Sequence, residues 1–158
     1  MKDNEIELPD LAKILGQALQ TIEPGQRPLL LAALERLAAR RYRKWANEHL
    51  DPQVKEGLLA CAEREDEIAR RVESLHPDAA EIQNRLLAEN PELLDLNRTL
   101  FEGRPIKDQF TMQAQGERAG AAAWSAFAAA TSEPSARELL QSCSPLEEAN
   151  AAFLYSLL

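Results

Sequence analysis

The chain contains the same sequence pattern twice, at an offset of 82 residues. Residues 25–76 align without gaps onto residues 107–158. The coincident pairs of residues include Glu35 with Glu117, Pro52 with Pro134, Cys61 with Cys143 and Glu65 with Glu147. Internal repetition at a fixed offset indicates a structural unit that is formed more than once. Whatever residues 25–76 fold into, the chain must therefore form it twice and pack the two copies together.

Each copy has the composition and punctuation of a helical hairpin. The chain is rich in Ala, Leu, Glu and Arg and poor in aromatic residues, and this composition favours helices. Proline follows an acidic residue at the start of the second helix of each copy, where a helix tolerates it best. Pro145 should kink or restart the last helix. The predicted antiparallel pairs are 27–49 with 52–75 and 107–131 with 134–157. The sequence thus predicts an all-α fold.

The segments outside the two copies extend this plan. Residues 9–22 have the pattern of a short amphipathic helix. Residues 77–106 contain two short helices and are long enough to run the length of a bundle, so the second and third long helices can be parallel. We expect this crossover to pack along the outside through Leu93, Leu94, Leu96 and Phe101. At 158 residues, the chain is most economically a single domain, 1–158.

Charge and hydropathy argue against several classes of partner. The net charge of −8 at pH 7 disfavours nucleic acid or an anionic membrane as the main partner. The N-terminal residues MKDNEIELPD are acidic and contain no apolar signal core, and no run approaches the length of a membrane span. We therefore expect a cytoplasmic protein with neither a nucleic-acid nor a membrane partner. The apolar helix faces favour a homodimer.

One glutamate on each predicted long helix lies within an apolar stripe. These residues are Glu35, Glu65, Glu117 and Glu147. The two in each copy are 30 residues apart, so hairpins related by a pseudo-twofold axis would bring all four to one level. Ionised carboxylates in a dry interior are costly, and they must be protonated, paired with arginine or bound to cations. Two divalent ions would neutralise them, and oxygen ligands suit Mn, Mg, Ca and Fe.

The segments LERLAARRY and LLACAEREDEIARRVESL, which carry the first two glutamates, resemble the ferritin-like superfamily, especially its rubrerythrin-type members. The resemblance covers residues 25–76 and 107–158. It implies a four-helix bundle with one long crossover. It also implies a di-iron or di-manganese site built from a Glu on each of two helices and a Glu-x-x-His on each of the others. Carried over to this chain, the metal ligands are Glu35, Glu65, Glu117 and Glu147.

Both histidines of the family pattern are replaced in this chain, by Ile68 and Asn150. Isoleucine has no donor atom, and asparagine offers only a weak oxygen ligand. Three functional interpretations follow. The first is a ferritin-like protein whose histidine-free, carboxylate-only remnant of a di-metal site binds iron, manganese or another divalent cation. The second is a metal-free bundle that acts as an interaction or dimerisation module. A third is an apolar ligand pocket in place of the metals, and no residue pattern identifies a reaction.

Two other groups of potential ligands compete with the four carboxylates. Cys61 and Cys143 each lie one turn before a glutamate of the set, and either are small buried residues or direct the site towards zinc. Glu73 and His76 form a literal Glu-x-x-His, but this motif ends its helix and has no counterpart in the second copy. The symmetry of the repeat therefore favours the four glutamates.

Overall fold

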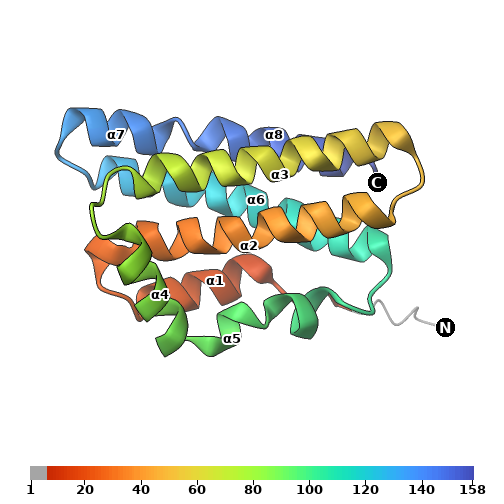
Figure 1. Cartoon of the computed structure of the whole chain (residues 1–158), viewed down its shortest axis with the longest axis horizontal. Helices are drawn as coiled ribbons and strands as arrows, with labels where there is room; N and C mark the ends of the chain where they lie inside the picture. Colours follow the sequence, from red (N-terminus) through yellow and green to blue (C-terminus); the bar gives the residue numbers. More distant parts are fainter. Residues whose placement is uncertain (1–6) are drawn as a thin grey trace.

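The structure is a computed structural model that describes residues 7–158, and most of these residues are helical (Figure 1). The long helices are α2 (Arg27–Glu48), α3 (Pro52–Glu73) and α6 (Ile106–Ala129), and a fourth rod consists of α7 (Pro134–Gln141) and α8 (Ser144–Ser156). The shorter elements are α1 (Leu11–Gln20), η1 (Pro24–Gln26), α4 (Ala79–Glu89), α5 (Pro91–Leu94) and the π-helical turn η2 (Asn97–Phe101). No strand occurs in the described part of the chain, which confirms the all-α prediction.

Equivalent acidic residues begin the second helix of each predicted hairpin. The Asp51 carboxylate accepts a hydrogen bond from the Gln53 amide and caps α3. The Glu133 carboxylate accepts bonds from the Ser135 and Ala136 amides and caps α7. Proline follows each cap, where its missing N–H leaves no bond unmade. The predicted helix starts are therefore correct, and most of the predicted bounds differ from the observed ones by one or two residues.

The last rod is interrupted at Ser142 and Cys143, between α7 and α8. Pro145 lies in the first turn of α8 and cannot donate to the preceding turn, so the helix restarts there as the sequence predicts. The two halves of the rod still pack against the same partner, α6. The interruption leaves Glu147 in the first turn of a new helix.

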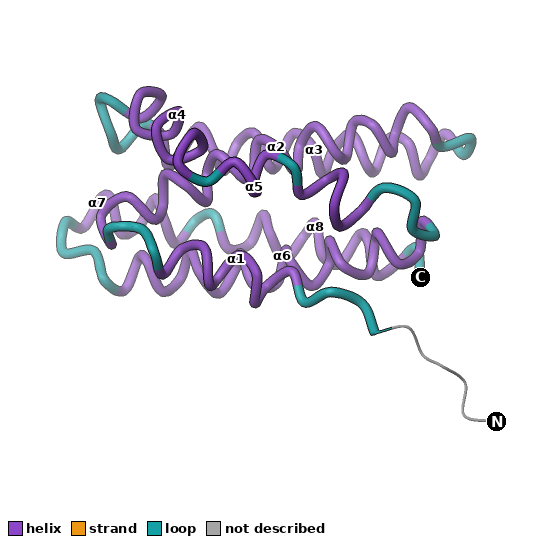
Figure 2. The backbone as a smooth tube through the Cα atoms, turned by 90° about the horizontal axis from the view of Figure 1, so that it is seen from below, coloured by secondary structure: helices purple, strands orange, loops and turns teal. Residues whose placement is uncertain are grey.

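The long helices form two antiparallel pairs. Helix α2 packs against α3, and α6 packs against both α7 and α8. Figure 1 shows that α3 and α6 run in the same direction, because the segment from α4 to η2 returns the chain along the outside of the bundle. Figure 2 shows the two pairs as two layers, with α1 beside the layer that contains α6. None of the helices in residues 7–158 is long and apolar enough to cross a membrane.

Most of the crossover residues that were expected to pack against the bundle do pack against it. Leu93 and Phe101 are buried, and Leu96 packs against the apolar cluster beneath the crossover. Leu94 is the exception: its side chain is 53% exposed, so the prediction that it packs inward is wrong. Successive residues of a helix point about 100° apart, and the short α5 cannot bury both of its leucines.

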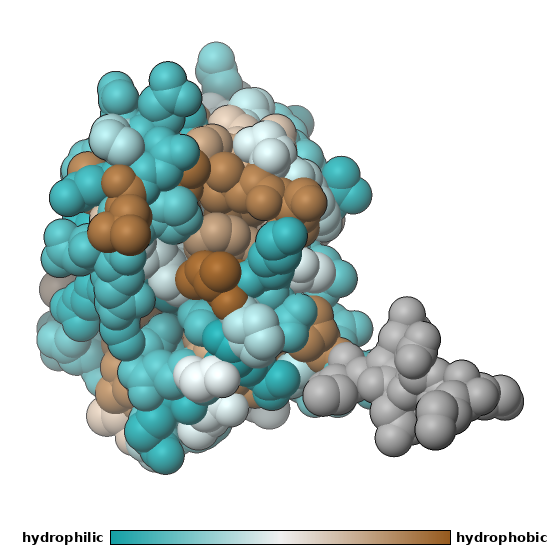
Figure 3. Space-filling model, turned by 90° about the vertical axis from the view of Figure 1, so that its right-hand side faces the viewer, coloured by the Kyte–Doolittle hydropathy of each residue, from teal (hydrophilic) through white to brown (hydrophobic). Residues whose placement is uncertain are grey.

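Apolar side chains are exposed at one end of the molecule. This end carries the link between α2 and α3, the start of α6 and the C-terminus (Figure 1), and Figure 3 shows apolar patches among its hydrophilic side chains. The segments named contain Leu50, which is 97% exposed, Ile106 and Leu158. These residues are candidates for the contact surface of the predicted homodimer, which remains a prediction.

Candidate metal centre

All four predicted glutamates lie inside the bundle, one on each long rod. Glu35 comes from α2, Glu65 from α3, Glu117 from α6 and Glu147 from α8, and none is more than 6% exposed. One carboxylate oxygen from each of Glu35, Glu65 and Glu147 lies within 4.8 Å of the other two. Glu117 is not one of these three converging groups, but it lines the same pocket as Glu35, and its charge contributes to raising the pKa of Glu65 and Glu147. The structure brings the four glutamates into one cluster.

The neighbours one turn away explain why each carboxylate points inward. Residues four positions apart share a helix face, so a buried apolar pair on either side carries the residue between them into the core. The flanking residues are buried for every glutamate of the cluster: Leu31 and Ala39, Cys61 and Ala69, Gln113 and Ala121, Cys143 and Ala151. Seven of these eight side chains are apolar or nearly so, which is the pattern recognised in the sequence.

Two aromatic side chains at equivalent positions of the repeat donate hydrogen bonds to the cluster. The Tyr42 hydroxyl donates to Glu117 Oε1 at 2.6 Å, and Trp124 Nε1 donates to Glu147 Oε1 at 2.9 Å. Tyr42 reaches from α2 to α6, in the other hairpin, whereas Trp124 bonds within its own hairpin. Equivalent residues therefore make different bonds, and the symmetry of the sequence is broken at the centre.

Asn150 stands where the family pattern has a histidine and bonds to a carboxylate of the cluster. Its Nδ2 donates to Glu65 Oε1 at 2.6 Å, and its Oδ1 accepts a bond from Arg64 Nη1 at 3.1 Å. Ile68, at the other histidine position, is fully buried in the apolar cluster that contains Trp124. Asn150 orients Glu65, whereas Ile68 contributes only packing.

A buried arginine is joined to the cluster through a glutamine. Arg41 Nη1 donates to Gln113 Oε1 at 2.7 Å, and Gln113 Nε2 donates to Glu117 Oε1 at 2.8 Å. Burial lowers the pKa of Arg41 to about 10. The sequence contains a signal for this arginine, because it lies one turn after Leu37 and one turn before Trp45 and so continues an apolar stripe.

Burial dominates the electrostatics of the carboxylates. It raises the pKa of Glu35, an effect that hydrogen bonding with Glu65 and Glu147 partly offsets. Burial, together with the charges of the neighbouring glutamates, raises the pKa of Glu65 and of Glu147 well above the ordinary value. Two buried oxygens, Glu65 Oε2 and Glu117 Oε2, have no hydrogen-bond partner. The cluster therefore contains more acceptor oxygens than its donors satisfy, in a place where ionisation is costly.

Within residues 7–158, the four carboxylates of the cluster form no ion pair with a surface arginine, although the sequence allows this alternative. Arg36, next to Glu35 in sequence, binds the carboxylates of Glu73 and Asp66 instead. Glu73 therefore accepts hydrogen bonds from Arg36 and also from Gln83. The Glu-x-x-His motif that ends α3 is thus part of an ion-paired surface and lies outside the carboxylate cluster.

Both cysteines are buried free thiols. Burial raises the pKa of Cys61 to about 12 and that of Cys143 to about 11, which disfavours the thiolate that zinc requires. Among residues 7–158, the one group of three or more His, Cys, Asp or Glu residues with converging ligand atoms is Glu35, Glu65 and Glu147. The geometry therefore favours oxygen ligands over the zinc alternative.

Gly120 has no side chain, and this leaves room for the Glu147 carboxylate. We therefore predict that a methyl group added at this position destabilises the protein. A Cβ at this position would lie 2.7 Å from Glu147 Oε1, so Gly120→Ala must displace a carboxylate that Trp124 holds. We expect the variant to unfold about 1–2 kcal/mol more easily despite the better helix propensity of alanine. Gly16→Ala is the control, because no atom lies within 4 Å of its added Cβ, and it should stabilise the protein. Urea unfolding measures both, and equal stabilisation of the two variants would contradict the prediction.

Comparison with known proteins adds no family to this description. No protein-family model, curated protein or solved structure matches the chain. The buried carboxylates and their surroundings are therefore the features of this chain that indicate a function.

Proposed function

We propose that the protein binds divalent metal ions at the cluster of Glu35, Glu65, Glu117 and Glu147. The observation that carries this proposal is the convergence of three buried carboxylates, whose oxygens lie within 4.8 Å of one another, in a cluster that includes a fourth. Such a group is costly without a counter-charge, because burial favours neutral carboxyls and each ionised one raises the pKa of the next. A divalent cation supplies that counter-charge.

The donor set fits a hard cation. Glu35, Glu65 and Glu147 would hold a first ion, and Glu117 adds a carboxylate beside them. The oxygens of Glu65 and Glu117 that lack a partner are the atoms that gain most from a ligand bond. Ligation by oxygen alone suits Mn²⁺, Fe²⁺, Mg²⁺ or Ca²⁺. If the ion is iron or manganese, it supplies redox and Lewis-acid chemistry at this position.

We further propose that the bundle has a ferritin-like arrangement, as the sequence resemblance implies. Three features support this: the two antiparallel pairs of rods, the crossover that makes α3 and α6 parallel, and one inward glutamate on each rod. The protein would then be a ferritin-like metal-binding protein in which Asn150 and Ile68 replace the two histidine ligands. Asn150 would orient a ligand carboxylate instead of binding the ion itself.

Calorimetric titration of the chelator-treated protein with Mn²⁺ and Co²⁺ tests the proposal, and elemental analysis gives the stoichiometry. We expect saturable binding that Glu147→Gln weakens at least tenfold, because the ion loses a charged ligand. Glu148→Gln is the matched control: it changes the exposed neighbour of Glu147 and should bind like the parent protein. If the two variants and the parent protein bind equally weakly, the metal proposal fails and the metal-free interaction module is the better interpretation.

A further inference from the structure

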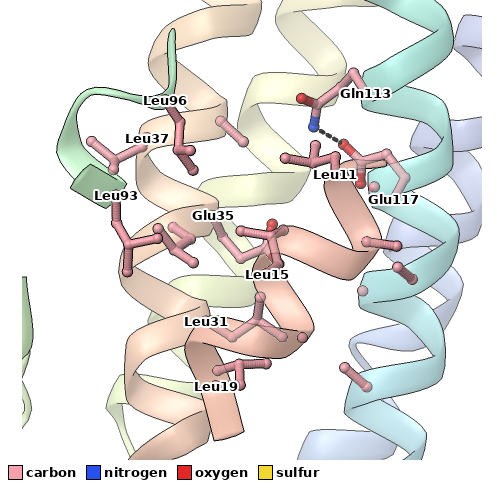
Figure 4. A pocket seen from close by; sticks show the side chains of 18 of the residues that line it. Leu11, Leu15, Leu19, Leu31, Glu35, Leu37, Leu93, Leu96, Gln113 and Glu117 are labelled. Atoms are coloured by element: carbon pink, nitrogen blue, oxygen red, sulfur yellow. Dashed lines mark hydrogen bonds between the residues drawn. The ribbon is translucent and has the colours of Figure 1, made fainter. Parts of the chain in front are cut away.

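A pocket of about 120 Å³ opens between α1, α2 and α6 and reaches two glutamates of the cluster. Its walls include Leu15 and Leu19 of α1 and Leu31 and Leu34 of α2, whereas Glu35 and Glu117 add carboxylates to the lining. Figure 4 shows the leucines around the space and Gln113 bonded to Glu117 on its far side. The cavity is thus apolar over most of its surface and polar at one place.

Small residues keep the pocket open. Ala38, Gly116, Ala119, Gly120 and Ala123 line it from α2 and α6, and Ala12 and Gly16 from α1. A Cβ built on Gly16 would meet no atom within 4 Å, so the space beside this residue is empty. A cavity of about 150 Å³ lined by apolar side chains is large enough to bind benzene. A molecule of about that size therefore matches this pocket.

Glu117, which lines the polar part of the pocket, has an acceptor oxygen without a donor. Tyr42 and Gln113 both donate to Glu117 Oε1, but Oε2 of the same carboxylate has no partner, although the side chain is only 1% exposed. A buried acceptor without a hydrogen bond is destabilising, and a ligand that donates one removes the penalty. Arg41 also lines the pocket, but its guanidinium already donates to Gln113 and Asn97, so the pocket offers no free cation to an anionic ligand.

We propose that this pocket binds a small, uncharged, mainly apolar molecule through a hydroxyl group that donates to Glu117 Oε2. The apolar body of the molecule lies among the leucines of α1 and α2, and α1 covers it. The inference goes beyond metal binding, because it depends on the pocket and on one carboxylate oxygen and is tested on the metal-free protein. Helix α1, which lies outside the two hairpins, then has a function as one wall of a ligand site.

Benzyl alcohol is a suitable probe, with toluene as the analogue without a hydroxyl and benzoate as the anion. The chain has six glycines, whose amides report on the site in a nitrogen–proton correlation spectrum. Gly16, Gly116 and Gly120 line the pocket, whereas Gly25, Gly57 and Gly103 do not. In the presence of chelator, benzyl alcohol should shift the first three amides. It should bind roughly tenfold more tightly than toluene, the ratio expected for one additional hydrogen bond. Benzoate should not bind.

Gly16→Leu places a side chain where an added Cβ meets no atom within 4 Å, and it improves the helix propensity of α1, so the variant should fold and occupy the pocket. We expect it to abolish the shifts of Gly116 and Gly120, whereas Gln17→Leu on the exposed face of α1 should preserve them. The inference is overturned if shifts persist in Gly16→Leu, if the other three glycines respond equally, or if toluene binds as tightly as benzyl alcohol. Metal binding is measured separately by calorimetry, so the failure of either proposal is recognised independently of the other.

Discussion

Without metal, the protein should lose stability as the pH rises from about 4.5 towards 8. Glutamates of the unfolded chain ionise near pH 4.5, whereas burial raises the pKa of Glu35, Glu65 and Glu147 in the folded state. Above pH 4.5 the unfolded chain therefore binds fewer protons than the folded protein, and the free energy of unfolding falls with pH. Each unit of raised pKa corresponds to about 1.4 kcal/mol. Three such groups make a loss of several kcal/mol the expected result.

Urea unfolding in chelator between pH 4.5 and 8 measures this loss, and added Mn²⁺ should reverse it. The cation requires ionised carboxylates, so the stabilisation that it provides increases with pH. At a free concentration 100 times the dissociation constant, the gain is about 2.7 kcal/mol. Stability should also decrease as the pH is lowered below 4.5. The reason is Glu73, whose pKa is lowered because the bonds from Arg36 and Gln83 outweigh burial. Metal-free protein that grows steadily more stable from pH 4.5 to 8 would contradict this account of the cluster.

Glu65→Gln should stabilise the metal-free protein at pH 8 and remove its response to metal. The amide keeps an oxygen for the bond from Asn150 Nδ2 and replaces the partnerless Oε2 with a group that can donate to a neighbouring carboxylate. It also removes an acid whose own pKa is raised well above the ordinary value, by burial and by the charges of Glu117, Glu35 and Glu147. We expect a gain of about 1–3 kcal/mol at pH 8 and little change at pH 5, where the parent carboxyl is already protonated.

The same substitution elsewhere on α3 should have the opposite sign. Glu73 accepts hydrogen bonds from Arg36 and Gln83, so Glu73→Gln removes a charged partner and should destabilise the protein by about 0.5–1 kcal/mol. The variant should retain the full stabilisation by Mn²⁺. Urea unfolding of both variants at pH 5 and pH 8, with and without Mn²⁺, separates the two cases. If Glu65→Gln is destabilised equally at both pH values, the carboxylate is a structural acceptor and carries no excess charge.

The sequence by itself determined the helices and the four inward carboxylates. Caps and prolines mark helix starts through local bonds, so Asp51, Glu133 and Pro145 act wherever the helix later packs. The inward position of Glu35 or Glu65 also follows from helix geometry, because buried neighbours four residues away force it. These features depend on short stretches of chain, and the repeat shows each of them twice.

Only the tertiary structure decided what surrounds the carboxylates. Tyr42 and Trp124 are equivalent in the repeat, yet one bonds across hairpins and the other within its own, since each donor reaches the acceptor that packing brings nearest. The link from Arg41 through Gln113 joins residues 72 positions apart, and no local rule pairs them. The apolar pocket likewise exists because α1 packs beside α2 and α6 without filling the space next to Gly16. Contacts between distant segments depend on how whole helices fit together, and sequence periodicity records only which face each helix buries.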